Sequence, residues 1–261
     1  MTPLSMASHG ETSVDPATAH VASDAAGGQG PDHKRAFVHQ LFTAIAPRYD
    51  WFNRLASLSL DQRWRRATVT MGQLRTGMVV LDVCTGSGDL ALLCARQLHG
   101  QGRVCGLDFT EAMLRAARRK HAAHAAPIQW LRADAQALPF QAESFDRVFI
   151  GFSTRNLSDL GLGLREMIRV LKRGGQLLIL ETGYPAHPAL RAAYQAFLLT
   201  IARTIGWALT GRAWPFTYLA RSVKGFLRPD QVVSLLNASG ASARYLPLTR
   251  GLASLYIADK P

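Results

Sequence analysis

A short apolar run that ends in a glycine-rich loop constrains the fold of this chain more than any other feature. Val79–Val83 is apolar except for Asp82, and it leads into Thr85-Gly86-Ser87-Gly88. A helical pattern over Asp89–Leu98 follows directly. The apolar run predicts a buried strand, and the glycines let the backbone approach a bound ligand closely. The loop is therefore expected at the carboxyl end of a strand, where open α/β sheets bind their ligands.

The alternation of strand and helix patterns continues along the chain. Further strands are expected at Val104–Leu107, Ile128–Leu131, Arg147–Ile150, Gln176–Leu180, Ala243–Leu246 and Leu252–Ala258. Helices are expected at Ala112–His121, Leu162–Leu171 and Pro229–Ala238. Basic residues and glycines at 172–175 suit the end of the second of these helices. The pattern predicts an α/β fold with a mostly parallel sheet, helices on both faces and an antiparallel hairpin at its end.

Residues outside the alternating region divide into three segments. Residues 1–35 have no aromatic residue and four acidic residues, so we expect a disordered tail that is neither a secretory signal nor an obvious transit peptide. Residues 36–77 show apolar residues at helical spacing, broken by Pro47. Residues 183–229 also have a helical pattern. We therefore expect one domain over 36–261, with helices at 36–77 and a helical insertion at 183–229.

Composition excludes several classes of protein. With 261 residues, 48% of them apolar, the chain can fill a large core. Its net charge of +12 permits a nucleic acid, an anionic lipid or an anionic small molecule as partner, without choosing among them. Cys84, Cys94 and Cys105 form no CxxC pair or Cys/His cluster, so neither a disulfide framework nor a metal site is expected. The apolar stretch 192–211 contains Gln195 and Arg203 and does not predict a membrane span.

Two carboxylates after later strands complete the pattern of a ligand site. Asp108 closes the second strand, twenty residues after Gly88, and a carboxylate there can accept both hydroxyls of a ribose. Asp134 follows the third strand. It suits the exocyclic amine of adenine, with the next backbone N–H facing the ring, but it equally suits a helix N-cap or a turn. The loop lacks the full G-x-G-x-x-G of a pyrophosphate turn. An adenosine without a pyrophosphate, such as S-adenosylmethionine, fits this set.

Motifs elsewhere in the chain carry a resemblance to a known family. They include Ala46-Pro47-Arg48-Tyr49-Asp50, Asp61-x-x-Trp64-Arg65, Gly86-Ser87-Gly88-Asp89-Leu90, Gly106-Leu107-Asp108, Ala133-Asp134-Ala135, Arg155-Asn156-Leu157 and the run 169–175. On these residues the chain resembles class I S-adenosylmethionine-dependent methyltransferases. It is more closely similar to the C-methyltransferases of menaquinone and ubiquinone biosynthesis, over about Phe37 to Lys260. The glycine loop is generic to methyltransferases, whereas the Ala-Pro-Arg-Tyr-Asp motif and Arg155-Asn156 are more diagnostic.

The resemblance implies a Rossmann-like class I methyltransferase fold. It has a seven-stranded, mostly parallel sheet with a reversed last strand and a helical cap over the acceptor. It also implies S-adenosylmethionine as methyl donor, without a metal. The implied cofactor-binding residues are Asp82, Gly86, Ser87, Gly88, Asp108, Asp134, Ala135 and Gly151.

The implied catalytic residues are Arg155, Asn156 and Tyr49. The reaction is an in-line displacement of a methyl group from a sulfonium to a ring carbon, and it depends mainly on alignment. Arginine stays protonated, so Arg155 is expected to stabilise a developing phenolate or polarise a water; the alternative is a salt bridge that caps a helix. Asn156 and Tyr49 are expected either to bond ring oxygens or to fix the N-terminal helices.

Departures from the family pattern leave the acceptor open. Gly151-Phe152, Ser153-Thr154 and Thr182-Gly183 stand where the family usually has Ser-Phe, Gly-Leu and Phe-Ser. The expected acceptor is a demethylated polyprenyl quinol, either demethylmenaquinol or its ubiquinol-pathway equivalent. The alternatives are a methyltransferase for a sterol or a secondary-metabolite phenol, a nucleic-acid methyltransferase and a non-catalytic binding protein. No RNA-binding module and no Asn/Asp-Pro-Pro-aromatic motif supports nucleic acid as a partner.

Residues 183–229 contain six basic residues, eight aromatic residues and no acidic residue. Such a segment predicts a cover over a hydrophobic acceptor and contact with anionic lipid. The alternative is an ordinary helical cap with aromatic side chains in its core and solvated arginines. We expect a cytoplasmic protein with peripheral membrane contact; the sequence does not predict an oligomeric state.

Overall fold

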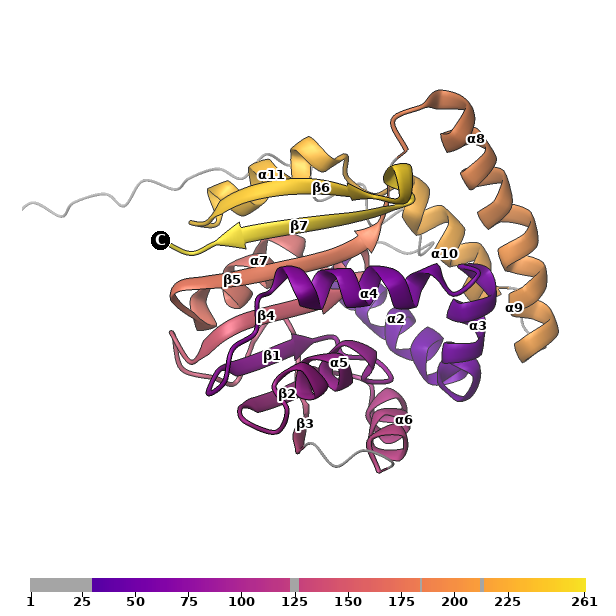
Figure 1. Cartoon of the computed structure of the whole chain (residues 1–261). Coiled ribbons are helices and arrows are strands. Elements are labelled where there is room, and N and C mark those ends of the chain that lie inside the picture. Colours follow the sequence, from indigo (N-terminus) through magenta and orange to yellow (C-terminus); the bar gives the residue numbers. More distant parts are fainter. Residues whose placement is uncertain (1–29, 123–126, 184, 212–213) are drawn as a thin grey trace, which may run out of the picture.

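A seven-stranded sheet forms the centre of the molecule (Figure 1), in the strand order β3-β2-β1-β4-β5-β7-β6. The structure is a computed structural model that describes residues 30–122, 127–183, 185–211 and 214–261. Its strands are β1 (Val79–Val83), β2 (Arg103–Asp108), β3 (Ile128–Arg132), β4 (Phe145–Gly151), β5 (Leu171–Thr182), β6 (Ser242–Leu248) and β7 (Ala253–Asp259). Strands β1 to β5 pair in parallel, and β7 is antiparallel to both β5 and β6. The predicted reversed last strand is confirmed.

Helices cover both faces of the sheet, as the apolar character of its strands requires. In chain order the α-helices are α2 (Pro31–Ile45), α3 (Tyr49–Ala56), α4 (Leu60–Met71), α5 (Asp89–Gln97), α6 (Glu111–His121), α7 (Leu160–Val170), α8 (Pro188–Phe197), α9 (Arg203–Thr210), α10 (Trp214–Lys224) and α11 (Pro229–Ala238). Helical turns of other kinds are η1 (Ala46–Arg48), η2 (Thr154–Asn156), η3 (Leu198–Ala202) and η4 (Thr249–Gly251). Helices α7 and α11 contribute to the core on one face, and α4 and α5 to the core on the other.

Helices α2 and α3 pack with η3 and α10 beside the sheet, whereas α4 lies against its face. Val38 and Leu41 of α2 and Phe52 of α3 share one hydrophobic cluster with Leu198 and Tyr218. In Figure 1 these helices stand together at the end of the sheet to which the strand arrows of β4 and β5 point. Two groups of helices, α2–α3 and α8–α10, with about 130 residues of chain between them, thus form one cover over the carboxyl ends of the parallel strands.

Two sequence-based expectations about segment boundaries are wrong. Helix α2 begins at Pro31, and Lys34 is buried, so residues 31–35 are part of the folded domain and not of a disordered tail; residues 1–29 lie outside the described part. Helix α7 ends at Val170, and the basic, glycine-containing run that follows belongs to β5. The reason is hydrogen bonding to the chain end: Gly174 N donates to Lys260 O at 2.9 Å and Lys260 N to Gly175 O at 3.0 Å.

We expect Gly183→Ala to destabilise the junction of β5 and β7. A Cβ at Gly183 would collide with the carbonyl oxygen of Gly251 and lie 2.6 Å from the backbone nitrogen of Ala253. Neither backbone atom can move without distorting the sheet edge, so the free energy of unfolding is expected to fall by about 1–3 kcal/mol in urea denaturation. In the control Gly161→Ala, the nearest atom is the tip of the Arg165 side chain, and stability is expected to hold or rise. Equal losses in both variants would contradict the steric argument.

Candidate active site

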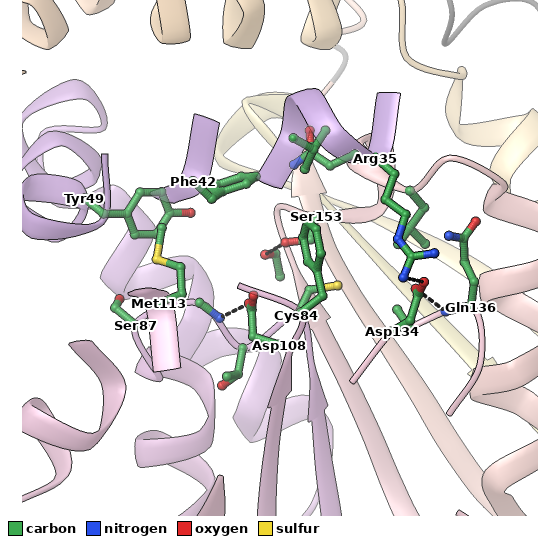
Figure 2. A pocket seen from close by; sticks show the side chains of 18 of the residues that line it. Arg35, Phe42, Tyr49, Cys84, Ser87, Asp108, Met113, Asp134, Gln136 and Ser153 are labelled. Carbon is green, nitrogen blue, oxygen red and sulfur yellow. Dashed lines mark hydrogen bonds and ion pairs between the residues drawn. The ribbon is translucent and has the colours of Figure 1, made fainter. Parts of the chain in front are cut away.

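A pocket lies where β1, β2 and β4 end, below the first helix (Figure 2). Arg35, Val38 and Phe42 of α2 lie on its helical side, and the glycine loop and Asp108 on its sheet side. The other lining residues are Tyr49, Arg65, Cys84, Ser87, Asp89, Phe109, Met113, Asp134, Ala135, Gln136, Gly151, Ser153, Asn156, Leu157 and Ser158. The pocket therefore combines carboxylates, an apolar roof and a backbone loop, all brought together by the parallel sheet.

The glycine loop owes its shape to Asp82, which is buried behind it. Asp82 Oδ2 accepts hydrogen bonds from Thr85 Oγ1 at 2.5 Å and from the backbone N–H of Ala91 at 3.0 Å. Burial raises the pKa of Asp82 to about 7. Gly86 and Gly88 have φ values of +57° and +86°, which favour glycine. Asp82 is not among the residues that line the pocket.

Gly88 lies outside the pocket lining as well. A Cβ at this position would lie 2.7 Å from the Trp130 ring and 3.2 Å from Ala117. Gly88 thus lets the start of α5 approach β3 and α6. Both Gly88 and Asp82 were expected to bind the cofactor; in the structure they shape the loop that other residues of the site present.

Asp108 ends β2 and faces the pocket as the sequence predicts. Its Oδ2 accepts a hydrogen bond from the backbone N–H of Gly86 at 2.9 Å (Figure 2), and its Oδ1 accepts one from the backbone N–H of Thr110 at 2.8 Å. Burial raises the pKa of Asp108 to about 6, although these hydrogen bonds oppose the shift. The carboxylate is therefore fixed against the loop, and each oxygen keeps a lone pair for a ligand hydroxyl.

Asp134 acts as a turn residue, one of its two sequence-based interpretations, and also lines the pocket. Its Oδ1 accepts from the backbone N–H of Gln136 at 2.9 Å, as a turn residue does. Its Oδ2 forms an ion pair with Arg35 Nη2 at 2.9 Å, at the rim of the pocket (Figure 2). The side chain of Arg35 is 53% exposed, so this contact across the pocket is a weak one.

The opposite end of the pocket holds a charged network around Ser87. Ser87 Oγ donates to Asp50 Oδ1 at 2.5 Å, and Lys120 Nζ contacts both Asp50 and Asp89 at 2.7 Å. Arg65 lies beside this network, with its Nε 3.7 Å from Asp89 Oδ2 and its guanidinium 5.1 Å from the centre of the Phe152 ring. The Nε donor is buried and has no hydrogen-bond acceptor within the described chain. This end of the pocket thus presents both cationic and anionic side chains to a ligand.

A second, apolar pocket opens beside the first. Its cavity volume is about 280 Å³. Phe42, Tyr49 and Asn156 line both pockets. The remaining lining residues are Leu41, Ile45, Phe52, Asn53, Ala56, Ser57, Leu58, Leu60, Asp61, Trp64, Phe152, Arg155, Thr182, Tyr194, Phe197, Leu198, Tyr218 and Leu252. The shared residues place a polar boundary between a carboxylate-containing pocket and an apolar one.

Arg155 reaches the second pocket from a buried ion pair. Its guanidinium bonds Glu181 Oε1 and donates to the carbonyl oxygen of Phe152 at 2.8 Å. Glu181 is fully buried and also accepts from Thr154 Oγ1 at 2.6 Å and from the backbone N–H of Thr182 at 2.8 Å. The salt-bridge alternative for Arg155 is therefore realised, to a strand carboxylate rather than at a helix end. The ion pair also fixes a cation at the pocket wall.

Phenol groups face Arg155 from three helices. Burial raises the pKa values of Tyr49, Tyr194 and Tyr218, that of Tyr194 to about 12. All three stay neutral at physiological pH and keep a proton to donate. Tyr218 donates to Asn156 Oδ1 at 3.3 Å. The buried Nδ2 of Asn156 has no acceptor among the residues described, so it is available to a ligand at the boundary.

Sequence reasoning found most of the site and missed four contributors. Gly86, Ser87, Asp108, Asp134, Ala135 and Gly151 all line the first pocket, and Tyr49 and Asn156 line both. The missed side chains are Arg35 and Arg65 in the first pocket and Tyr194 and Tyr218 in the second. The signal for Arg65 was present in the Trp64-Arg65 motif. The tyrosines carried only the general signal of an aromatic-rich, acid-free segment. Over the described ranges, no group of three or more His, Cys, Asp or Glu side chains could hold a metal ion.

Comparison with known proteins settles the family. A profile of the ubiE/COQ5 methyltransferase family matches residues 30–260. This chain belongs to that family. It is 39% identical to the demethylmenaquinone methyltransferase of Thermus thermophilus over 221 residues, which cover 85% of this chain and all of that protein. It is 38% identical to a ubiquinone/menaquinone biosynthesis C-methyltransferase of a Geobacter species, over 85% of this chain and 96% of that protein.

Solved structures agree on the fold. A SAM-dependent methyltransferase from Aquifex aeolicus superposes with a TM-score of 0.56 at 19% identity, over 74% of this chain and 88% of that one. The class I methyltransferase fold expected from the sequence is confirmed. The protein is an S-adenosylmethionine-dependent methyltransferase, and the donor set of the first pocket fits this cofactor. Asp108 suits the ribose, and Asp134 and Ala135 suit the adenine. The guanidinium of Arg65, whose Nε lies 3.6 Å from Asp61 and 3.7 Å from Asp89 without a hydrogen bond, suits a ligand carboxylate.

We expect Asp108→Asn to weaken S-adenosylmethionine binding. The amide replaces one acceptor oxygen by a donor at the position that faces the pocket, and hydrogen bonds to charged groups contribute roughly 1.5–3 kcal/mol. The dissociation constant measured by calorimetry is therefore expected to rise by about 10- to 100-fold. Asp230→Asn is the matched control, because Asp230 is 66% exposed on α11. An unchanged affinity in the folded Asp108 variant would remove Asp108 from the cofactor site.

Proposed function

We propose that this protein transfers a methyl group from S-adenosylmethionine to a ring carbon of a demethylated polyprenyl quinol. One observation carries the proposal: the cofactor pocket and an apolar pocket meet at Phe42, Tyr49 and Asn156. A quinol has a polar, redox-active ring and a long apolar tail. It needs hydrogen-bonding groups at one end of its site and apolar walls along the rest, which is how the second pocket is lined.

The residues at the pocket boundary suit the ring. Tyr49, Asn156 and Arg155 surround the position where it would lie next to the cofactor. Leu41, Ile45 and Phe52 belong to the wall along which the tail would run. The pocket extends to Leu58, which is 80% exposed. The tail therefore has a route to the molecular surface.

The chemistry assigned to these residues is alignment and charge stabilisation. When bound, S-adenosylmethionine supplies a methyl carbon attached to a positively charged sulfur. The acceptor carbon becomes nucleophilic as the neighbouring ring hydroxyl loses its proton to solvent at the open end of the apolar pocket. That carbon would bond the methyl group as the sulfur–methyl bond breaks, which leaves a neutral thioether, and the proton on the methylated ring carbon would then pass to solvent to restore the aromatic ring. Arg155, held by Glu181, stabilises the negative charge on that oxygen and remains protonated. Tyr49 and Asn156 orient the ring, so that the approach to the methyl carbon is in line.

The names of the relatives favour a naphthoquinol ring. The Thermus thermophilus protein and its counterpart in Deinococcus radiodurans are demethylmenaquinone methyltransferases, at 39% and 38% identity. The Geobacter relative is named for both ubiquinone and menaquinone biosynthesis. We therefore infer demethylmenaquinol as the acceptor, with the benzoquinol equivalent as the alternative.

We also propose that one apolar face contacts the membrane in which such quinols dissolve. This face, the α3–η3–α9 patch, consists of six exposed side chains: Trp51, Leu55, Leu58, Leu199, Ile201 and Trp207. Helices α3 and α9 pack against each other, and Leu58 also lines the apolar pocket. The segment 183–229, which contains Leu199, Ile201 and Trp207 of this patch, has six basic residues and no acidic residue, which complements anionic lipid. No described helix is both long and apolar enough to cross a bilayer.

The acceptor is tested by supplying labelled S-adenosylmethionine with demethylmenaquinol, a demethylated benzoquinol, a simple phenol and RNA in parallel. We expect label in the reduced naphthoquinol, little in the phenol and none in RNA. Extraction of quinones from a deletion strain is the companion measurement, and a demethylated naphthoquinone is expected to accumulate. An unchanged quinone profile together with no transfer to either quinol would refute the proposed function.

The membrane contact is tested with Trp51→Ser combined with Trp207→Ser. Neither tryptophan lines a pocket, so turnover of a short-chain, water-soluble quinol is expected to stay near that of the wild type. Flotation with anionic vesicles is expected to fall several-fold, because each buried aromatic side chain contributes substantially to interfacial binding. Leu162→Ser on α7 is the control. Wild-type flotation of the double variant would exclude the patch, and equal binding to neutral vesicles would exclude the charge contribution.

A further inference from the structure

Lys34 is a buried cation that the reaction chemistry above does not use. It lies in the first turn of α2 and is 4% exposed. Burial lowers the pKa of Lys34 to about 8. Within the described part of the chain, no carboxylate forms an ion pair with its ammonium group. Burying a lysine costs free energy unless its N–H donors form hydrogen bonds. The hydrogen-bond partners of Lys34 therefore indicate its role.

Those partners are two backbone carbonyls on either side of Asn156. Lys34 Nζ donates to the carbonyl oxygen of Leu157 at 2.5 Å and to that of Arg155 at 3.1 Å. One ammonium group thus fixes the 155–156 and 157–158 peptide groups, on either side of the Asn156–Leu157 peptide. More than 120 residues of chain separate the donor from these acceptors, so the contact is purely tertiary.

Arg155 is held at both ends as a result. Its carbonyl oxygen accepts from Lys34, and its guanidinium bonds Glu181. The backbone bonds within the 3₁₀ turn are short-range, from Asn156 N to Ser153 O at 2.9 Å and from Leu157 N to Thr154 O at 3.3 Å. From the strand side, Glu181 accepts from Thr154 Oγ1 at 2.6 Å and from Arg155 N at 3.4 Å, and Lys34 holds the turn from the opposite, helical side. The orientation of the Asn156 side chain at the boundary of the two pockets therefore depends on an anchor outside the turn.

We propose that Lys34 is a positioning residue, which orients Arg155 and Asn156 through their backbone and couples them to the roof of the cofactor pocket. The same helix α2 carries Arg35, Val38 and Phe42 over that pocket. A displacement of α2 thus moves the acceptor-side turn with it. The inference rests on the proposed function where its readout is methyl transfer, but the order of the turn is measurable without an acceptor.

A purely structural role is the competing explanation, and Lys260 provides the control. Lys260 Nζ also donates to two backbone carbonyls, those of Leu171 at 2.7 Å and Arg169 at 3.3 Å, and its side chain is 17% exposed. It lies near the C-terminus, at the end of the sheet away from α2 and α3 (Figure 1). Lys260→Met therefore removes two ammonium–carbonyl hydrogen bonds, as Lys34→Met does, together with a 3.8 Å ion pair to the exposed Glu143, and it does so remote from both pockets.

The experiment compares Lys34→Met, Lys34→Arg and Lys260→Met in the full-length protein. We expect Lys34→Met to lower kcat by roughly 10- to 100-fold at saturating substrates, since small misplacements of positioning groups cost this much. The KM for S-adenosylmethionine is expected to change far less. Lys34→Arg keeps two donors and is expected to recover part of kcat. Lys260→Met is expected to lower the Tm comparably while kcat stays near that of the wild type.

Hydrogen exchange separates failure of this inference from failure of the proposed function. Lys34→Met is expected to speed amide exchange over residues 153–158, and Lys260→Met is not, whatever the acceptor. If the wild type methylates no quinol, the proposed function fails while the exchange data still test the anchor. Unchanged exchange at 153–158, or equal kcat in Lys34→Met, Lys260→Met and the wild type, would overturn the positioning role.

Discussion

The buried carboxylate of Asp82 is the contact on which the cofactor pocket depends. It joins the last part of β1 to the glycine loop through Thr85 and to α5 through Ala91, and its second oxygen has no hydrogen-bond partner among described residues. Burying a carboxylate in this way is unfavourable, as its raised pKa shows. The two bonds offset part of this cost and hold the loop open toward Asp108. The contacts that Gly86 and Ser87 are expected to make with a ligand depend on this conformation of the loop.

The second requirement is a cover over the junction of the two pockets. Neither the N-terminal helices nor the 183–229 segment supplies it alone, because each contributes only part of the shared hydrophobic cluster. Their packing places Tyr49 from one segment and Tyr194 and Tyr218 from the other around Arg155. The Arg155–Glu181 ion pair is buried, and the field of a fixed cation acts more strongly in such surroundings than in water. The apolar pocket therefore has its full lining only when both parts of the cover are packed together.

Much of this arrangement is readable from the sequence, and the exceptions have physical reasons. Local sequence patterns predict the strand before the glycine loop, the position of Asp108 and the final hairpin. A parallel sheet brings the carboxyl ends of its strands together, so Asp108 lies beside the loop. Sequence spacing alone could not show that Asp82 and Gly88 lie outside the pocket lining. Residues that face a ligand and residues that face away from it are neighbours in sequence at a tight turn, so spacing does not separate them. Lys34 escaped notice because a single lysine next to a polar tail has the composition of a solvated segment, and its acceptors are backbone oxygens with no sequence signature.

The open end of the apolar pocket at Leu58 bears on how selective the protein is for the length of its acceptor. A closed pocket would limit the length of the prenyl tail, because an added isoprene unit would meet the pocket wall. Here the channel leads to an exposed apolar rim, so additional units meet no wall; with that rim against lipid, as proposed above, they contribute the same free energy bound or free. Discrimination then rests on the headgroup and the first carbons of the side chain, and homologues that differ only in the number of prenyl units are equivalent to the enzyme.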